Sequence, residues 1–154
     1  MIHWEDIELG VSQVSPLTYT LTAENIKEFA GTWDPFPPHI DEEFAARSPI
    51  GQLFAAGVHL LSVTIRLSHS IPAGETSAIA SQGWEGVRFR RPGIAGDTLR
   101  TRVTHIERRE GKRPETGLLI SRFELINQHD KVILAFDSNV VMLKRDTNAA
   151  TREA

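Results

Sequence analysis

Two side chains that can exchange protons lie in a short segment rich in proline. Asp34 and His39 are separated by four residues in the run WDPFPPHI, residues 33–40, which contains three prolines. Proline fixes one backbone torsion and excludes regular strand or mid-helix structure, so we expect a stiff, irregular loop. At neutral pH an aspartate accepts protons, whereas an imidazole donates or accepts them. Such a pair can hold one water molecule and move two protons, although a random Asp and His more often serve a turn and a core.

Helical patterns lie on both sides of this loop. Thr22 is placed to cap a helix over AENIKEFAG, residues 23–31, in which Gly31 is the expected end. Asp41 is placed to cap a second short helix over EEFAAR, residues 42–47. The loop that carries Asp34 and His39 is therefore expected to be held between two short helices.

The apolar segment 53–71 predicts a longer helix that other elements surround, because its apolar residues cover more than one face. Segment 11–21 predicts a strand, and four further strand-like segments follow, bounded by glycine, proline and polar turns. These segments are residues 77–91, 97–109, 116–127 and 131–143, and the last two are typical of a hairpin. The order predicts an α+β fold in which an antiparallel sheet wraps around one central helix. We expect one domain over residues 1–145 and a disordered tail over residues 146–154.

Composition excludes several classes of protein. The chain has 154 residues, a formal net charge of −3 and no cysteine, so thiolate catalysis and cysteine-ligated zinc are excluded. The weak net charge gives no overall attraction to nucleic acid or to an anionic membrane, and we expect neither as a partner. No apolar run is long enough to span a bilayer, and the first residues do not resemble a signal peptide. A cytoplasmic location is the default expectation.

Residues 29–59, FAGTWDPFPPHIDEEFAARSPIGQLFAAGVH, resemble the signature of the MaoC-like dehydratases, which include the R-specific enoyl-CoA hydratases. In that family an Asp, four intervening residues and a His precede an Asp, a short helix and a glycine-bearing run that opens the central helix of a hot-dog fold. The matching residues here are Asp34, His39, Asp41, Ala45, Gly51 and Gly57. Residues 89–103, FRRPGIAGDTLRTRV, resemble the family's strand, turn and strand, and the resemblance extends over roughly residues 5 to 143.

The resemblance implies reversible hydration of a 2-enoyl thioester. Asp34 and His39 would clamp the attacking water, one accepting its proton and the other delivering a proton to carbon 2, with the assignment left open. Gly57 lies near the expected start of the central helix, where amide groups without partners converge. Its amide would donate to the thioester oxygen, and the missing Cβ would let the thioester approach closely.

The chain departs from the family at one position beside the catalytic pair. Phe36 stands where the family commonly has Asn or Gln, and its side chain forms no hydrogen bond. We expect Phe36 to reshape the acyl pocket. Together with Phe54, Ala56 and Val58 it is expected to contact the substrate.

An acyl-CoA thioester is the implied substrate, with coenzyme A as part of the substrate and no separate cofactor. The histidines show no metal-ligand spacing, so we expect no metal. Residues 88–113 contain nine basic and three acidic residues, which favours a solvated sheet face, with coenzyme A phosphates as the alternative. A homodimer or a larger homo-oligomer is expected because hot-dog proteins as a class join their sheets.

Two other functions are alternatives to hydration. A hot-dog thioesterase would use a carboxylate from the central helix, but residues 57–70 contain no Asp or Glu. A non-catalytic acyl-CoA-binding subunit is supported by Phe36 and opposed by the presence of both Asp34 and His39.

Overall fold

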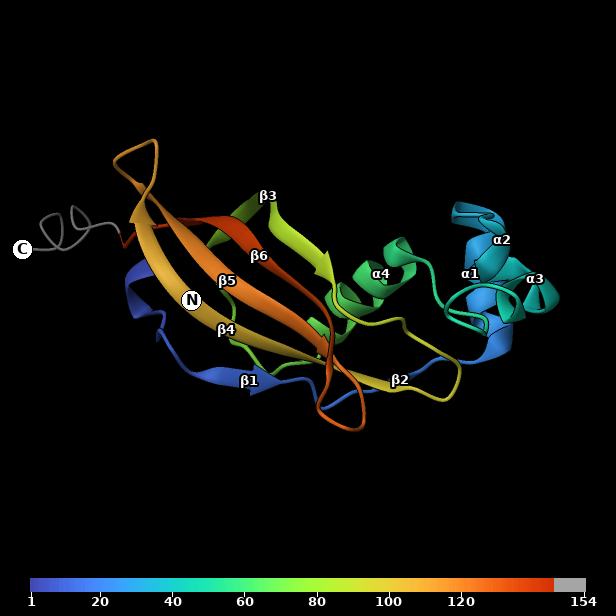
Figure 1. Ribbon diagram of the computed structural model, residues 1–154. Coiled ribbons are helices and arrows are strands. Elements are labelled where there is room, and N and C mark those ends of the chain that lie inside the picture. Colours follow the sequence, from blue (N-terminus) through green and yellow to red (C-terminus); the bar gives the residue numbers. More distant parts are fainter. Residues whose placement is uncertain (146–154) are drawn as a thin grey trace, which may run out of the picture.

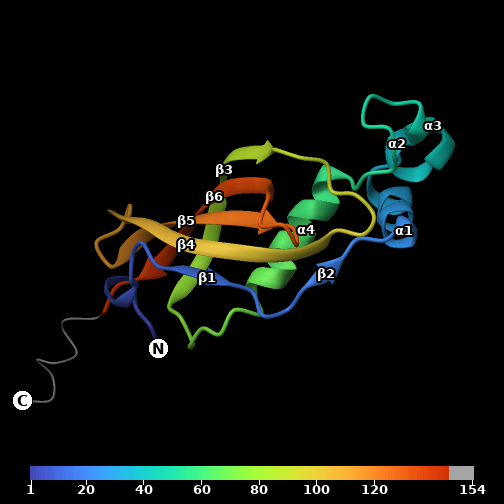
Figure 2. The ribbon, with the colours of Figure 1, turned by 60° about the horizontal axis from the view of Figure 1, so that its bottom comes forward.

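The computed structural model describes residues 1–145, in which an antiparallel sheet curves around the helix α4, Gly57–Ser68 (Figures 1 and 2). The strands are β1 (Ser12–Val14), β2 (Tyr19–Thr20), β3 (Ala78–Phe89), β4 (Thr98–Glu110), β5 (Thr116–Ile126) and β6 (Val132–Leu143). The order across the sheet is β1-β4-β5-β6-β3, and β2 also pairs with β4. A short 3-10 helix, η1 (Trp4–Asp6), precedes β1. The α+β architecture predicted from the sequence is confirmed.

The four long strands lie within two residues of their expected bounds, and β5 and β6 form the expected hairpin. The single strand expected over residues 11–21 is wrong, because the structure has the short strands β1 and β2 in its place. Pro16 lies between them and has no N–H to donate to the neighbouring strand β4, so the ladder is interrupted there.

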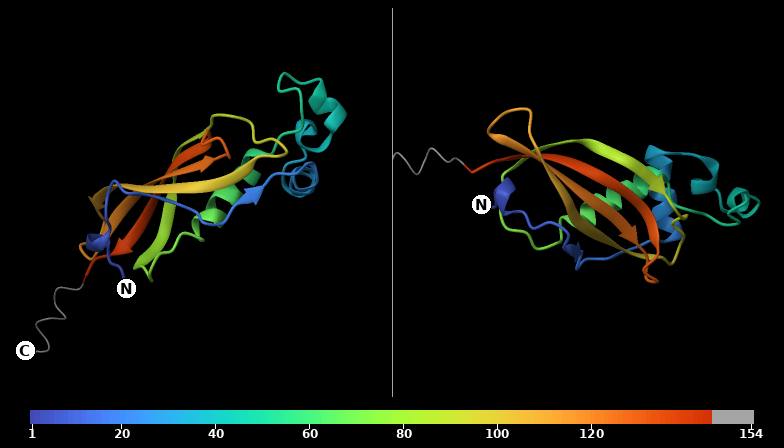
Figure 3. Two further views of the ribbon diagram at one scale, coloured as in Figure 1. Left: turned by 90° about the horizontal axis from the view of Figure 1, so that it is seen from below. Right: turned by 60° about the vertical axis from the view of Figure 1, so that its left-hand side comes forward.

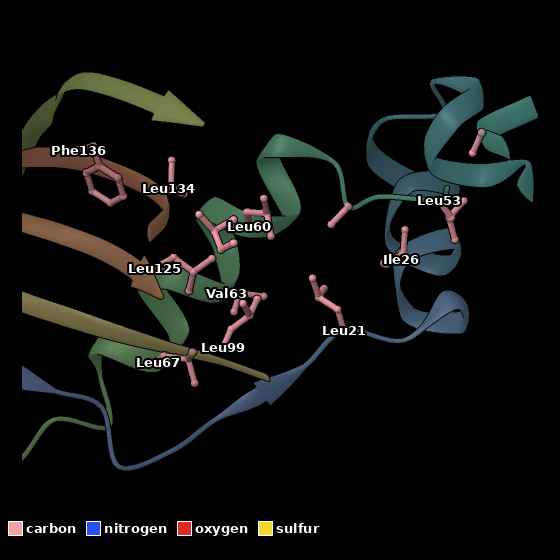
Figure 4. Close-up of a cluster of buried hydrophobic side chains, with 13 residues drawn as sticks. Leu21, Ile26, Leu53, Leu60, Val63, Leu67, Leu99, Leu125, Leu134 and Phe136 are labelled. Carbon is pink, nitrogen blue, oxygen red and sulfur yellow. The ribbon is translucent and has the colours of Figure 1, made fainter. Parts of the chain in front are cut away.

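The core forms where α4 lies against β4 and β5. Figure 4 shows Leu60, Val63 and Leu67 of α4 among the buried side chains, together with Leu99 and Leu125 of the sheet. Each of these side chains is at most 6% exposed, and burying each stabilises the fold by about 1.5–3 kcal/mol. The sheet therefore covers one face of α4, but Val58 and Arg66 on another face are exposed, so the helix is not surrounded on all sides as expected.

The central helix begins later than expected, at Gly57 and not at Leu53. Phe54 pairs with Ile94 as an isolated bridge, and the amide of Ala55 donates to the carbonyl of Gly93 at 2.8 Å. This pairing holds residues 53–56 extended, so the apolar run is divided between a strand-like segment and a helix.

Three helices lie beyond one end of the sheet (Figure 3): α1 (Ala23–Trp33), α2 (Pro37–Ile40) and α3 (Glu42–Ala46). The predicted caps are both present. Thr22 Oγ1 accepts from the Asn25 amide at 3.1 Å, and Asp41 Oδ1 accepts from the Phe44 amide at 2.9 Å. These bonds satisfy amide groups that a helix start leaves without partners.

Two expectations for this region are corrected. The first helix continues past Gly31 to Trp33, because an interior glycine weakens a helix without ending it. The proline-rich segment is not wholly irregular, since Pro37 and Pro38 start the helical turn α2. Proline is tolerated at the first helical positions, where an N–H would have no partner.

None of the helices within residues 1–145 has both the length and the apolar character needed to cross a membrane. The disordered tail expected over residues 146–154 lies outside the described residues. The single-domain boundary at residue 145 stays a prediction.

Candidate active site

The structure brings Asp34 and His39 together at the junction of α1 and α2. Asp34 ends α1, and its amide donates to the carbonyl of Ala30 at 2.9 Å. His39 lies on the single turn of α2, with its Nε2 atom 3.7 Å from Asp34 Oδ2. The imidazole is 6% exposed, whereas the carboxylate side chain is 42% exposed. One member of the pair is therefore buried, and the other is open to solvent.

The orientation of the imidazole is set by Phe54. His39 Nδ1 lies 2.7 Å from the backbone oxygen of Phe54, and a carbonyl oxygen only accepts, so Nδ1 carries the proton. In the neutral ring Nε2 is then an acceptor, and it is the nitrogen that faces Asp34. The rings of Phe36 and Phe54 contact the imidazole edge-on, with centroids at 5.5 and 4.8 Å. The side chain of Phe36 thus contacts the catalytic candidate through its ring, where the family commonly has an amide.

The gap between the two side chains suits a water molecule. A separation of 3.7 Å between Asp34 Oδ2 and His39 Nε2 exceeds a direct hydrogen bond. A water molecule can donate one hydrogen to each acceptor and thereby bridge them. Its oxygen then keeps its lone pairs available for attack on an electrophilic carbon.

Gly57 is the first residue of α4. The amides of His59 and Leu60 donate to the carbonyl of Ala56, but within residues 1–145 the Gly57 amide has no hydrogen-bond acceptor. A Cβ at residue 57 would lie 2.7 Å from the tip of the Phe89 ring. The amide is therefore available to a ligand at the positive end of a 12-residue helix, and packing against Phe89 favours glycine.

The loop between β3 and β4 positions the start of α4. Its Gly93 carbonyl accepts from the Ala55 amide, and a Cβ on Gly93 would lie 2.9 Å from Leu60 of α4. Gly96 has a φ of +96°, and Asp97 Oδ2 accepts from the Ile94 amide at 3.0 Å, which closes the turn. The motif that supported the family resemblance therefore holds Gly57 in place without itself taking part in proton transfer.

His39 and Gly57 line one cavity of about 420 Å³. Phe54, Phe89, Arg90 and Arg91 also line it. Asp34 does not line this cavity and lies beside His39. An imidazole, an amide without an acceptor and two cations thus surround a mainly apolar space.

Arg90 and Arg91 are the two basic residues of segment 88–113 that line this cavity. Sequence reasoning did not single them out, although both directly precede Pro92 in the turn motif. Five other basic residues of the segment bond to protein groups: Arg88 to the carbonyl of Val87, Arg100 to Asp130, Arg102 to Glu124, Arg109 to Glu107, and Arg108 to the carbonyl of Glu5. This pairing agrees with the solvated sheet face expected for most of the segment.

Of the four residues expected to contact the substrate, two line a cavity and two do not. Phe54 lines the cavity, and Phe36 lines an adjacent one. Ala56 is fully buried, and its carbonyl accepts from the amides of His59 and Leu60. Val58 is 46% exposed and lies outside both cavities. For Ala56 and Val58 the expected contact stays a prediction without support from the cavity.

His59 is a structural residue of α4. It is 2% exposed, its ring stacks on Phe29 with centroids 4.4 Å apart, and its Nε2 lies 3.0 Å from the Tyr19 hydroxyl. Burial lowers the pKa of His59, which favours the neutral ring. The contacts join α1, β2 and α4.

The chain is similar in sequence to several known proteins. A family model described as the MaoC like domain matches residues 7–121. The chain is 29% identical over 159 residues to β-methylmalyl-CoA dehydratase of Chloroflexus aurantiacus, covering 97% of this chain and 42% of that protein. It is 29% identical over 102 residues to mesaconyl-CoA hydratase of Cereibacter sphaeroides, covering 66% of this chain and 28% of that protein. The chain spans less than half the length of these two relatives.

Solved structures show the same fold. The MaoC-like dehydratase of Rhodospirillum rubrum superposes with a TM-score of 0.84 at 30% identity, covering 94% of this chain and 99% of that one. A Mycobacterium tuberculosis protein described as a double hotdog fold superposes with a TM-score of 0.74 at 21% identity, covering 94% and 45%. The expected hot-dog fold is confirmed.

Proposed function

The chain belongs to the MaoC-like dehydratase family, and on that premise we propose that it reversibly hydrates a 2-enoyl-CoA thioester to a 3-hydroxyacyl thioester. The observation that carries the proposal is the shared cavity of His39 and the Gly57 amide, with Asp34 3.7 Å from the imidazole. A nucleophilic water and an oxyanion donor can both reach one bound thioester in that arrangement.

The proposed reaction begins with the thioester oxygen accepting a hydrogen bond from the Gly57 amide. The water held by Asp34 and His39 loses a proton to one of them, and its oxygen bonds to carbon 3. The electron pair of the double bond moves toward the thioester oxygen, where the helix start stabilises the enolate. The proton taken from the water passes to the other member of the pair, which delivers it to carbon 2. Both groups thereby return to their starting state, and dehydration follows the same steps in reverse.

Arg90 and Arg91 support coenzyme A as the carrier of the acyl group. Both line the cavity at the loop that follows β3, and guanidinium groups bind phosphate oxygens through paired hydrogen bonds. The thioester end of the acyl group would meet the apolar wall formed by Phe54, Leu60 and Phe89.

Hydration of crotonyl-CoA tests the proposal. We expect the absorbance of the conjugated enoyl thioester to disappear without release of free thiol, because water adds to carbon 3 and the C–S bond stays intact. The measurement is ultraviolet absorbance, together with a colorimetric thiol assay. Thiol release would support the thioesterase alternative, and binding without either change would support a non-catalytic subunit.

We further propose that a second copy of the chain pairs with β3. This strand forms one edge of the sheet, and all its residues except Val87 are largely exposed. Ile79, Trp84 and Phe89 are 57%, 43% and 51% exposed, which is unusual for large apolar side chains on a free strand edge. Because Phe89 also lines the cavity, the dimer interface would border the site.

Ile79→Arg should weaken the dimer, because it places a charge without a partner in the proposed interface. We expect the dimer dissociation constant to rise by about 100-fold or more. Light scattering after size-exclusion chromatography measures the mass at several concentrations. Val14→Arg on β1, at the opposite edge of the sheet, is the control and should leave the dimer intact. A monomeric parent protein, or equal dissociation of both variants, would contradict pairing through β3.

A further inference from the structure

A second cavity of about 510 Å³ adjoins the site. It shares Ile50 and Phe54 with the cavity that contains His39, and the Phe54 carbonyl holds the His39 ring. Its apolar walls come from α2, α3 and the segment after α3, and are formed by Phe36, Pro38, Phe44, Pro49, Ile50 and Phe54. The second cavity therefore adjoins the cavity of His39 through two shared residues, and neither Gly57 nor Arg90 lines it.

Arg47 is the charged residue that lines this second cavity. The other polar side chain there, Ser48, donates to the Ala45 carbonyl at 2.7 Å and accepts from the Gly51 amide, so its hydroxyl is already engaged. Among residues 1–145 no carboxylate forms an ion pair with Arg47, and none lines the cavity. An apolar cavity with one cation that lacks a protein partner is complementary to an apolar ligand that ends in an anion.

We propose that the second cavity takes the acyl group and that Arg47 binds a carboxylate at its far end. This inference rests on the proposed hydratase function and specifies its substrate as the CoA thioester of an unsaturated dicarboxylic acid. The coenzyme A phosphates would meet Arg90 and Arg91, and the distal carboxylate would meet Arg47. The reacting carbons then lie between the two sets of cations, beside His39. A guanidinium group suits this task because it binds both carboxylate oxygens at once.

Matched pairs of thioesters test the inference. Each pair shares its chain length and differs only in a terminal methyl or carboxylate group, for example crotonyl-CoA with fumaryl-CoA, and the longer 2-enoyl thioesters with their ω-carboxylates. In at least one pair we expect kcat/KM to be about 10-fold or more higher for the carboxylate. Arg47→Gln should lower kcat/KM for the carboxylate substrate by about 10- to 100-fold, as for a lost charge-assisted hydrogen bond. It should change kcat/KM for the methyl substrate by less than about 3-fold.

Two further variants distinguish a loss of carboxylate binding from a general loss of activity. Arg47→Lys keeps the positive charge but loses the paired N–H donors of the guanidinium group. It should therefore retain part of the preference for the carboxylate substrate. Arg66→Gln removes an exposed arginine of α4 outside both cavities and should leave both substrates unchanged. Equal activity toward both members of every pair, or equal losses in Arg47→Gln, would overturn the inference while leaving hydration intact.

Binding of saturated analogues distinguishes the proposed hydratase function from the proposed carboxylate site at Arg47. Calorimetry with adipoyl-CoA and hexanoyl-CoA measures the preference for a carboxylate without any reaction. If no enoyl thioester is hydrated but Arg47→Gln selectively weakens adipoyl-CoA binding, the proposed function fails and the carboxylate site stands. Absence of both hydration and selective binding overturns both proposals.

Discussion

Asp34→Asn and His39→Asn each reduce kcat for hydration by about 10²- to 10⁴-fold, the contribution expected of a positioned acid or base. Asparagine at residue 34 keeps the size of the side chain but loses the charge. At residue 39 its amide can still donate to the Phe54 carbonyl, so the loss isolates the role of Nε2. The double variant should be nearly as active as the weaker single variant, because both side chains act on one water. Absorbance of the enoyl thioester under saturating substrate measures each rate.

Matched controls exist for both substitutions. Asp130→Asn alters an exposed aspartate with a φ of +55°, a conformation that asparagine tolerates. His69→Asn alters an exposed histidine at the end of α4. Both should retain full activity. If Asp34→Asn also retained full activity, the carboxylate would have no part in proton transfer, and the mechanism would be wrong even if the enzyme hydrates enoyl thioesters.

Gly57→Ala reduces kcat/KM by about 10²- to 10³-fold, the usual effect of disabling one oxyanion donor. The added methyl group would lie 2.7 Å from the tip of the Phe89 ring, so the ring must shift into the cavity. The methyl group also blocks the approach of the thioester oxygen to the amide. Stability should change little, because Phe89 is 51% exposed and its ring has room to turn. Steady-state kinetics and the melting temperature measure the two effects separately.

Gly31→Ala is the control for Gly57→Ala. Gly31 lies within α1, and a Cβ there would meet nothing within 4 Å. The substitution should stabilise the protein by about 0.5–1 kcal/mol and leave the kinetics unchanged. The double variant Gly57→Ala with Phe89→Leu then identifies the cause. Recovered activity would assign the loss to the displaced ring, and persistent loss would assign it to the blocked amide. Full activity of Gly57→Ala alone would exclude the proposed oxyanion site.

Local sequence determined most of the secondary structure. Thr22 and Asp41 cap the helices that they were expected to cap, because each cap is a contact between residues three positions apart. The four long strands follow from alternation and from turn residues between them. The late start of α4 was not predicted because a distant segment competes for the backbone there. Residues 53–56 are apolar enough for a helix but pair with the loop around Ile94.

The residue types and spacing of Asp34 and His39 are compatible with proton transfer, but only the resemblance of residues 29–59 to the MaoC-like dehydratases implied hydration and a role for Gly57. Only the tertiary structure decided which imidazole nitrogen faces Asp34, because the Phe54 carbonyl that binds Nδ1 comes from a segment 15 residues away. It also decided that Arg90 and Arg47 line the two cavities, since all the arginines of a sequence carry the same charge. The physical reason is that a hydrogen bond or a cavity wall depends on where separate segments pack, and spacing along the chain does not encode that distance.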